Sequence, residues 1–156
     1  MRTIRRRRLE KKTDYKARLA LLKSNRPRLV LRKTNSYVIA QIIETKDSQD
    51  HVLVGITSKI LLDKGWPKEN EGSLKNKVAA YLTGFLIGKL AQEKGIKSAI
   101  LDIGMHRNVH KSRLYALLKG SIDAGLKIPH NPEALPTEQE LQKNEKFKQI
   151  INKIIK

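Results

Sequence analysis

Cysteine is absent from the 156-residue sequence, so a disulfide framework and a thiolate metal site are both excluded. Long apolar runs are absent too. The longest uncharged apolar stretch, residues 78–88, is well short of the roughly 18 residues that a membrane-spanning helix requires. No apolar segment follows the basic N-terminus, so we expect no secretory signal. We therefore expect a cytoplasmic protein without membrane contact.

Acidic residues are scarce: 15 Asp and Glu stand against 33 Lys and Arg, which gives a net charge of +18. The excess is concentrated at the N-terminus, where residues 1–33 hold 14 Lys or Arg and only Glu10 and Asp14 as acids. Residues 34–103 are nearly balanced, with nine bases and eight acids. Such a distribution predicts a polyanionic partner for the basic segments and a scaffold role for the balanced one.

Two basic stretches are candidate contact surfaces. Residues 1–12 hold seven cations and form a predicted arm that orders against RNA or DNA, although a solvated tail has the same composition. Residues 104–119 contain no acid and hold four cations and two histidines. We expect this second stretch to form an RNA contact of its own, beside a sheet and ahead of a helix that begins near Arg113.

The hydrophobic pattern predicts an α/β fold. Thr13 is a plausible N-cap for a helix that Pro27 would stop. Residues 28–33, 37–45 and 51–58 are predicted to form a three-stranded antiparallel meander. A helix over about 73–94, a further strand over 97–102 and a helix over about 113–124 complete a mixed sheet with packed helices. The small residues Ala80, Gly84 and Gly88 should let the long helix approach the sheet closely.

Catalysis has little support in the sequence. His106 and His110 have metal-ligand spacing, but no cysteine or acidic third ligand is near them. Asp102, Glu44 and Asp123 could hold Mg²⁺ only if they converged, so a Mg²⁺-dependent nuclease is the alternative function. We expect no catalytic residue, no metal, no cofactor and no small-molecule substrate. With aromatic residues at 4%, few stacking platforms are available, so structured RNA held through phosphate and shape is the favoured target.

Several ordered motifs resemble one protein family. Residues 26–42 (RPRLVLRKTNSYVIAQI) resemble the first hairpin of universal large-subunit ribosomal protein eighteen. The segments RRR at 6–8, TDY at 13–15, AAYLTG at 79–84, LDIG at 101–104, KGSIDAGL at 119–126 and IPH at 128–130 are similar to its archaeal and eukaryotic branch. At Glu140 the chain departs from the arginine expected there, so C-terminal contacts of relatives are not transferred.

The resemblance implies a non-enzymatic protein that binds 5S rRNA, attaches it to 23S-type rRNA at the central protuberance and neighbours other large-subunit proteins. We divide the chain into a basic arm (1–12), an α/β 5S rRNA-binding domain (13–132) and a C-terminal extension (133–156). The expected RNA contacts are Arg2, Arg5, Arg6, Arg7, Arg8, Lys11, Lys12, Tyr15, Arg18, Arg26, Arg28, Arg32, Lys33, Asn35, Ser36, Tyr37, Gln41, His106, Arg107, His110, Lys111, Ser112 and Arg113.

The C-terminal residues 138–156 show isoleucines and Phe147 at three-four spacing, which predicts an amphipathic helix. Two placements of this helix are open. It either docks on a neighbouring protein or rRNA, or folds back to complete the core of its own domain.

Overall fold

Four strands form one mixed sheet in the computed structural model, which describes residues 6–10, 12–47 and 49–141. The strands β1 (Arg28–Lys33), β2 (Val38–Lys46) and β3 (Gln49–Thr57) make an antiparallel meander. The short strand β4 (Ile100–Asp102) pairs in parallel with β1, so the strand order is β3-β2-β1-β4. The predicted α/β fold with its meander and added strand is confirmed.

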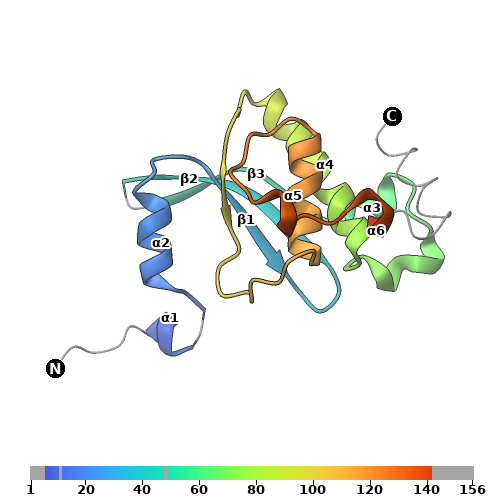
Figure 1. Ribbon diagram of the computed structural model, residues 1–156, viewed down its shortest axis with the longest axis horizontal. Helices are drawn as coiled ribbons and strands as arrows, with labels where there is room; N and C mark the ends of the chain where they lie inside the picture. Colours follow the sequence, from blue (N-terminus) through green and yellow to red (C-terminus); the bar gives the residue numbers. More distant parts are fainter. Residues whose placement is uncertain (1–5, 11, 48, 142–156) are drawn as a thin grey trace.

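One face of the sheet carries the core. Leu29 and Leu31 of β1 lie opposite Ile42 and Ala40 of β2, and all four side chains are fully buried in one cluster with helices α4 (Lys77–Glu93) and α5 (Arg113–Asp123). Figure 1 shows α4 and α5 side by side, with helix α2 (Tyr15–Leu22) apart from them at the end of the molecule that carries the N-terminus. Alternate residues of β1 therefore point to the other face, where Arg28 and Val30 are also buried and Arg32 is partly exposed.

Glycines set the distance between α4 and α5. A Cβ atom on Gly84 would overlap the carbonyl oxygen of Leu117, and one on Gly120 would overlap that of Tyr81. A Cβ on Gly88 would come within 2.6 Å of the Cβ of Ala124. Gly84 and Gly88 of α4 thus admit the backbone of α5, and for these two residues the prediction that they admit the sheet is wrong. The sequence shows that small residues share one face of this helix, but it does not show which element packs against that face.

Several boundaries differ from those predicted. Helix α4 begins at Lys77 instead of near residue 73, because Asn76 caps it by accepting from the Ala79 N–H at 2.7 Å. The preceding segment, Lys68–Ser73, forms a 3₁₀ turn. Strand β4 has only three residues, since Ser98 and Ala99 pair with Lys127 instead of β1. The predicted end of α5 at Gly125 is confirmed: its φ of 99° is left-handed, which favours glycine.

The remaining elements are short: α1 (Arg6–Leu9), α3 (Ile60–Asp63), a 3₁₀ turn at Pro132–Ala134 and α6 (Glu138–Leu141). Residues 142–156, and with them most of the predicted C-terminal helix, lie outside the described residues. Ala134 and Leu141 are buried, and Leu141 belongs to the core cluster. The start of the C-terminal extension therefore folds onto its own domain. Within the described ranges, no helix is long and apolar enough to cross a bilayer.

Candidate nucleic-acid interface

Arg28 lies inside the sheet. Its side chain is only 3% exposed, and its guanidinium donates to Asp102 Oδ2 at 2.8 Å, Asp50 Oδ1 at 2.9 Å and Thr45 Oγ1 at 3.2 Å. The guanidinium is buried, and its Nε is buried too, without a hydrogen-bond partner among the described residues, so a phosphate could not reach the group. The structure therefore argues against Arg28 as a contact residue. It positions strand β4 and the β2–β3 hairpin against β1.

Arg32, two residues further along β1, is held in place but still reaches the surface. Its Nη1 donates to the carbonyl oxygens of Leu31 at 2.7 Å and Asp102 at 3.0 Å, and its Nη2 lies 3.4 Å from Asp102 Oδ1. The side chain remains 40% exposed. Gly104 makes room for it, because a Cβ there would lie 2.9 Å from the guanidinium carbon. A preorganised arginine of this kind loses little entropy when it grips phosphate.

Helix α2 contributes no buried residue to the core. Asp14, and not the predicted Thr13, is its N-cap: the Asp14 carboxylate accepts from the N–H groups of Lys16 at 3.0 Å and Ala17 at 3.2 Å. Thr13 instead accepts from Arg7 Nε at 3.0 Å. The helix is fastened to the β2–β3 hairpin by Arg18, which donates to Asp50 Oδ2 at 2.7 Å. It is thus an outlying element that carries cations.

Asp50 is the acidic link between α2 and β1. Burial acts to raise its pKa, but hydrogen bonds from Thr45 and Arg18 and the charges of Arg28 and Arg18 outweigh it and hold the pKa of Asp50 below its usual value. Asp50 therefore stays ionised and neutralises part of both arginines. Arg18 and Arg28 are consequently paired with an acid of the chain itself. Arg7, in contrast, donates to the uncharged Thr13 hydroxyl.

Of the predicted arm, the structure describes the last part. Arg6 pairs with Glu10 at 3.0 Å and Lys12 pairs with Glu10 at 2.8 Å, and all three are solvent-accessible. Arg2, Arg5, Lys11 and the side chain of Arg8 lie outside the described residues. Surface ion pairs of this kind contribute little to stability, so a phosphate group could readily replace the carboxylate as the partner of these cations. That the arm orders on RNA stays a prediction.

The acid-free loop between β4 and α5 is attached to the end of β1. His106 Nε2 accepts the Lys33 backbone N–H at 3.1 Å. Burial, followed by the charges of Arg32 and Lys33, lowers the pKa of His106, so the ring is neutral and can accept. His106 therefore positions the acid-free loop against the end of β1.

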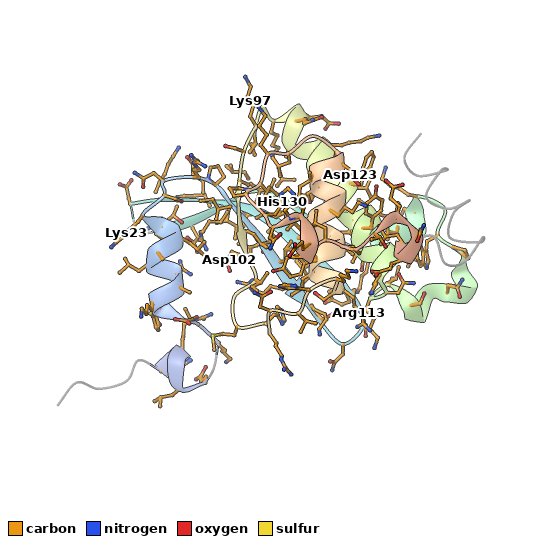
Figure 2. All side chains as sticks on the ribbon, in the orientation of Figure 1. Lys23, Lys97, Asp102, Arg113, Asp123 and His130 are labelled. Carbon is orange, nitrogen blue, oxygen red and sulfur yellow. The ribbon has the colours of Figure 1, made fainter. Side chains whose placement is uncertain are left out.

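Beyond His106, three polar side chains of the loop are exposed to solvent, namely Arg107, His110 and Lys111, whereas the Ser112 hydroxyl is buried. Arg107 is exposed and Arg113 half-buried, and neither side chain has a hydrogen bond or ion pair within the described part of the chain. Lys111 pairs with Glu140 at 3.3 Å, and the exposed His110 meets the Tyr115 ring edge-on. Ser112 is the N-cap residue of α5, yet its side chain makes no capping bond. Figure 2 shows Arg113 at the opposite side of the molecule from Lys97.

A groove of about 360 Å³ runs along this loop. Lys33, Arg107 and Arg113 line it, and so does Lys77 from the first turn of α4. Sequence reasoning missed Lys77, because it lies in the charge-balanced part of the chain and only tertiary packing brings it to the loop. Met105 and Val109, each about half exposed, add apolar surface nearby.

The β1–β2 turn carries the remaining predicted contacts. Asn35 and Ser36 are exposed, and Arg26 is exposed before β1. Tyr37 is half-buried, and Lys59 Nζ lies 4.9 Å from its ring centroid, so one face of this proposed base-stacking ring is already covered by a cation. Two partly buried residues complete the predicted set: Gln41, on the face of β2 away from the helices, and Tyr15, which begins α2.

The carboxylates that would form a nuclease site do not come together. Asp102 accepts from Arg28, Arg32 and the Gly104 N–H, whereas Asp123 accepts from the Tyr81 hydroxyl at 2.9 Å. Glu44 pairs with Lys46 at 3.2 Å. In the ranges that the structure covers, no group of three His, Asp or Glu side chains could hold a metal ion. Nothing in this geometry favours the nuclease alternative.

Comparison with known proteins gives a consistent result. The family model described as ribosomal large subunit proteins 60S L5 and 50S L18 matches residues 1–98 and 88–131. Proteins named large ribosomal subunit protein uL18 are similar to 88% of the chain: 50% identical over 137 residues in Korarchaeum cryptofilum, 44% over 138 in Aeropyrum pernix and 45% over 137 in Methanothermobacter thermautotrophicus. The matched parts span 68%, 63% and 69% of those relatives, respectively.

Proposed function

The chain belongs to the family of ribosomal large-subunit proteins 60S L5 and 50S L18, as its motifs predicted, and from this membership we propose that it binds 5S rRNA and helps attach it to the large-subunit rRNA at the central protuberance. The family is structural and not enzymatic. As a ribosomal constituent the protein would work in the cytoplasm, where ribosomes translate.

One observation carries the proposal: the predicted basic stretches adjoin along the end of β1. We call this surface the basic belt and define it by six residues, Arg7, Arg18, Arg32, Lys33, Arg107 and Arg113. The Arg32 guanidinium lies against Gly104, and the Lys33 N–H donates to His106, so the α2 side and the loop side are joined. The acids nearest the belt, Asp50 and Asp102, are already engaged by arginines.

Structured RNA fits the basic belt better than an unstructured strand does. Sequence-neutral single-strand binders need rows of aromatic platforms, and no belt residue is aromatic. Arginines that are fixed by their own hydrogen bonds match phosphate oxygens at defined spacing along a folded RNA. The belt has a groove near each end, so one chain could hold two RNAs side by side, which is what attachment of 5S rRNA requires.

A gel-shift experiment tests the proposal. The protein is titrated at physiological salt with an archaeal 5S rRNA, with a large-subunit rRNA fragment from the central protuberance, and with an unrelated folded RNA of the 5S length. We expect tight complexes with the first two, a ternary complex when both are present, and weaker binding of the unrelated RNA. Equal affinity for all three would contradict the proposal. RNA cleavage in Mg²⁺ would instead support the nuclease alternative.

Neighbouring ribosomal proteins are proposed partners of the C-terminal extension. Glu140, where the family pattern has arginine, lies 3.3 Å from Lys111 and 4.0 Å from Lys77, and Leu141 is buried. These contacts fix the start of the extension on its own domain, which leaves residues 142–156 as the segment available to a neighbour. Truncation after Leu141 should leave the melting temperature almost unchanged and weaken incorporation into subunits. A large drop in melting temperature would mean that the segment completes the domain's own core.

A further inference from the structure

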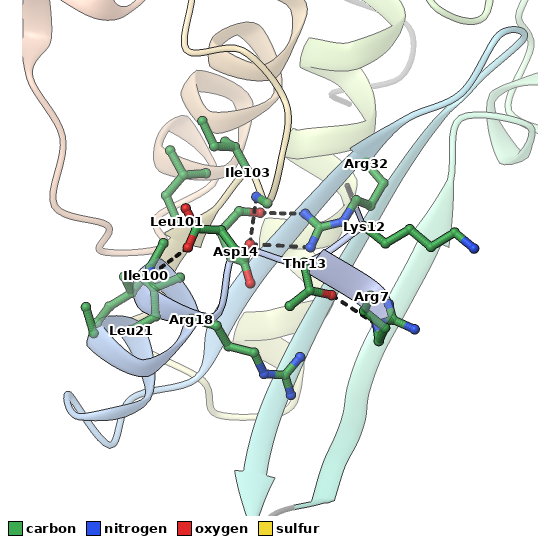
Figure 3. A pocket seen from close by; sticks show the side chains of 14 residues that line it. Arg7, Lys12, Thr13, Asp14, Arg18, Leu21, Arg32, Ile100, Leu101 and Ile103 are labelled. Carbon is green, nitrogen blue, oxygen red and sulfur yellow. Dashed lines mark hydrogen bonds and ion pairs between the residues drawn. The ribbon is translucent and has the colours of Figure 1, made fainter. Parts of the chain in front are cut away.

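A cleft of about 610 Å³ separates helix α2 from the edge strand β4. Its volume falls in the range of sites that enclose a small ligand. Figure 3 shows the aliphatic side chains of Ile100, Leu101, Ile103 and Leu21 at one side of the cleft and the guanidinium groups of Arg7, Arg18 and Arg32 at the other. An apolar wall facing a cationic wall is an arrangement that neither the fold nor the ion pairs of α2 require.

The cleft is open in part because two of the α2 side chains that face it are alanines. Ala17, Ala20 and Leu21 are at helical three- and four-residue spacing, so they share the face that lines the cleft. Both alanines are exposed. Larger apolar residues here would close α2 onto Ile100 and Leu101 and bury it, as amphipathic helices ordinarily do. Instead, α2 is held by the Arg18–Asp50 ion pair at 2.7 Å, and the apolar wall stays accessible.

The charge of the cleft is positive. Arg7, Arg18, Arg32 and Lys12 line it. Two carboxylates also line the cleft, and both already accept hydrogen bonds: Asp14 caps α2, and Asp102 accepts from the arginines of β1. The backbone of Leu101 adds polar groups at the edge. The Ile100 N–H donates to Pro27 O, so by parallel pairing the Leu101 N–H and C=O point away from β1.

We propose that this cleft takes one unstacked nucleotide of the bound rRNA. Its base would lie between Ala17 and the aliphatic wall of β4, and its flanking phosphates would be gripped by Arg7, Arg18 and Arg32. A nucleotide combines a flat apolar face with an adjacent anion, which matches the two walls. This inference rests on the proposed function and adds to it a specific, single-stranded contact. It also gives a reason why helix α2 does not pack against the core of the domain.

Other occupants match less well. An RNA double helix presents phosphates on its outside and stacked bases within, so it could contact the rim but not the aliphatic wall. An extended peptide could pair with the edge of β4, but an ordinary peptide offers no anion for three guanidinium groups. The cationic wall therefore favours a nucleotide over both.

Two single substitutions on α2 test the proposal. Ala17→Phe fills the cleft, whereas Leu19→Phe adds the same ring on the other side of the helix, where Leu19 is 57% exposed and does not line the cleft. Neither position is buried, so both variants should fold and melt like the unaltered protein. We expect Ala17→Phe to weaken binding to 5S rRNA or to the large-subunit fragment by about tenfold or more, as loss of a base contact does, and Leu19→Phe to change it less than twofold.

Cysteine protection gives a second readout, since the chain has no cysteine of its own. Ala20→Cys places a thiol in the cleft and Glu93→Cys places one at the exposed end of α4. Saturating RNA should slow maleimide labelling of the first thiol and leave the second unchanged.

The outcomes separate the two proposals. If the unaltered protein binds both RNAs but Ala17→Phe behaves like Leu19→Phe, or if the Ala20→Cys thiol stays reactive, the cleft proposal is overturned and the proposed function stands. If the unaltered protein binds neither RNA, the proposed function itself fails. The cleft proposal holds only if affinity falls and the thiol is protected.

Discussion

The guanidinium of Arg32 occupies the space beside Gly104 that a side chain on residue 104 would fill: an added Cβ would lie 2.9 Å from its Cζ atom. Gly104 has a φ of 58°, a left-handed conformation that disfavours L side chains. Glycine at position 104 is therefore required for two reasons: its backbone conformation is left-handed, and the space beside it holds the Arg32 guanidinium.

Gly104→Ala should cost about 1–3 kcal/mol of unfolding free energy and also weaken RNA binding, because it displaces Arg32. Gly95→Ala is the matched control. Gly95 has a φ of 72° but no atom near its added Cβ, so it reports the backbone cost alone. Chemical denaturation and RNA affinity are measured for both. Equal loss of affinity in the two variants would contradict the role given to Arg32.

Asp102→Ala should destabilise the protein by about 3 kcal/mol or more, because it leaves the buried guanidinium of Arg28 without its closest carboxylate. Glu44→Ala is the control, since Glu44 pairs with Lys46 at the surface and should change stability by less than about 1 kcal/mol. Urea unfolding measures both. A small effect of Asp102→Ala would mean that Asp50 alone can hold Arg28.

Gly84→Ala and Gly120→Ala should each destabilise by about 3 kcal/mol or more, because the added methyl group would overlap backbone carbonyls of the facing helix. Gly72→Ala, with no atom within 4 Å of the added Cβ, is the control. The melting temperatures of the three variants test this prediction. If both helix variants melt like Gly72→Ala, α4 and α5 can separate without cost and the packing described for them is not the one that stabilises the domain.

Acid should detach the 103–112 loop from β1. The folded-state pKa of His106 lies below its unfolded value of 6.5, so its contribution to stability is complete above pH 6.5 and is lost as the pH falls through the folded pKa. Protonation removes the Nε2 lone pair that accepts the Lys33 N–H. Hydrogen exchange of the Lys33 amide should therefore accelerate, after correction for intrinsic rates, as the pH drops. In His106→Gln, which does not titrate, the acceleration should be absent; its persistence would point to another group.

Removing two loop arginines should reduce the salt dependence of RNA binding. If Arg107 and Arg113 each contact a phosphate, the double variant Arg107→Ala/Arg113→Ala should lower the slope of log affinity against log salt by about 1.5. Lys97→Ala/Lys127→Ala removes the same charge from two exposed positions. Lys97 lies on the opposite side of the molecule from Arg113 (Figure 2), and the Lys127 N–H donates to the Lys97 carbonyl oxygen, so this variant should leave the slope nearly unchanged. Identical RNA footprints for the two double variants would show that the loop charge is incidental.

The meander and the family could be predicted from local signals: alternating apolar residues, turn formers and ordered motifs. The burial and pairing of Arg28 could not be predicted from such signals. Alternation places it on the same face as Arg32, but its neutralising acids come from 22 and 74 residues further along the chain. The α4–α5 contact was missed for a related reason, since a row of small residues fits a helix or a sheet equally well. The predicted cap of α2 was displaced by one residue because threonine and aspartate are adjacent here and both occur at N-caps, with aspartate the more strongly preferred.

Helix α2 contributes no buried side chain to the core, so substitutions on its surface should change the free energy of folding very little. Under the cleft proposal, variation on the cleft face of α2 is therefore limited by the RNA partner and hardly by folding. The helix can therefore follow changes in its RNA site residue by residue while the domain behind it stays the same.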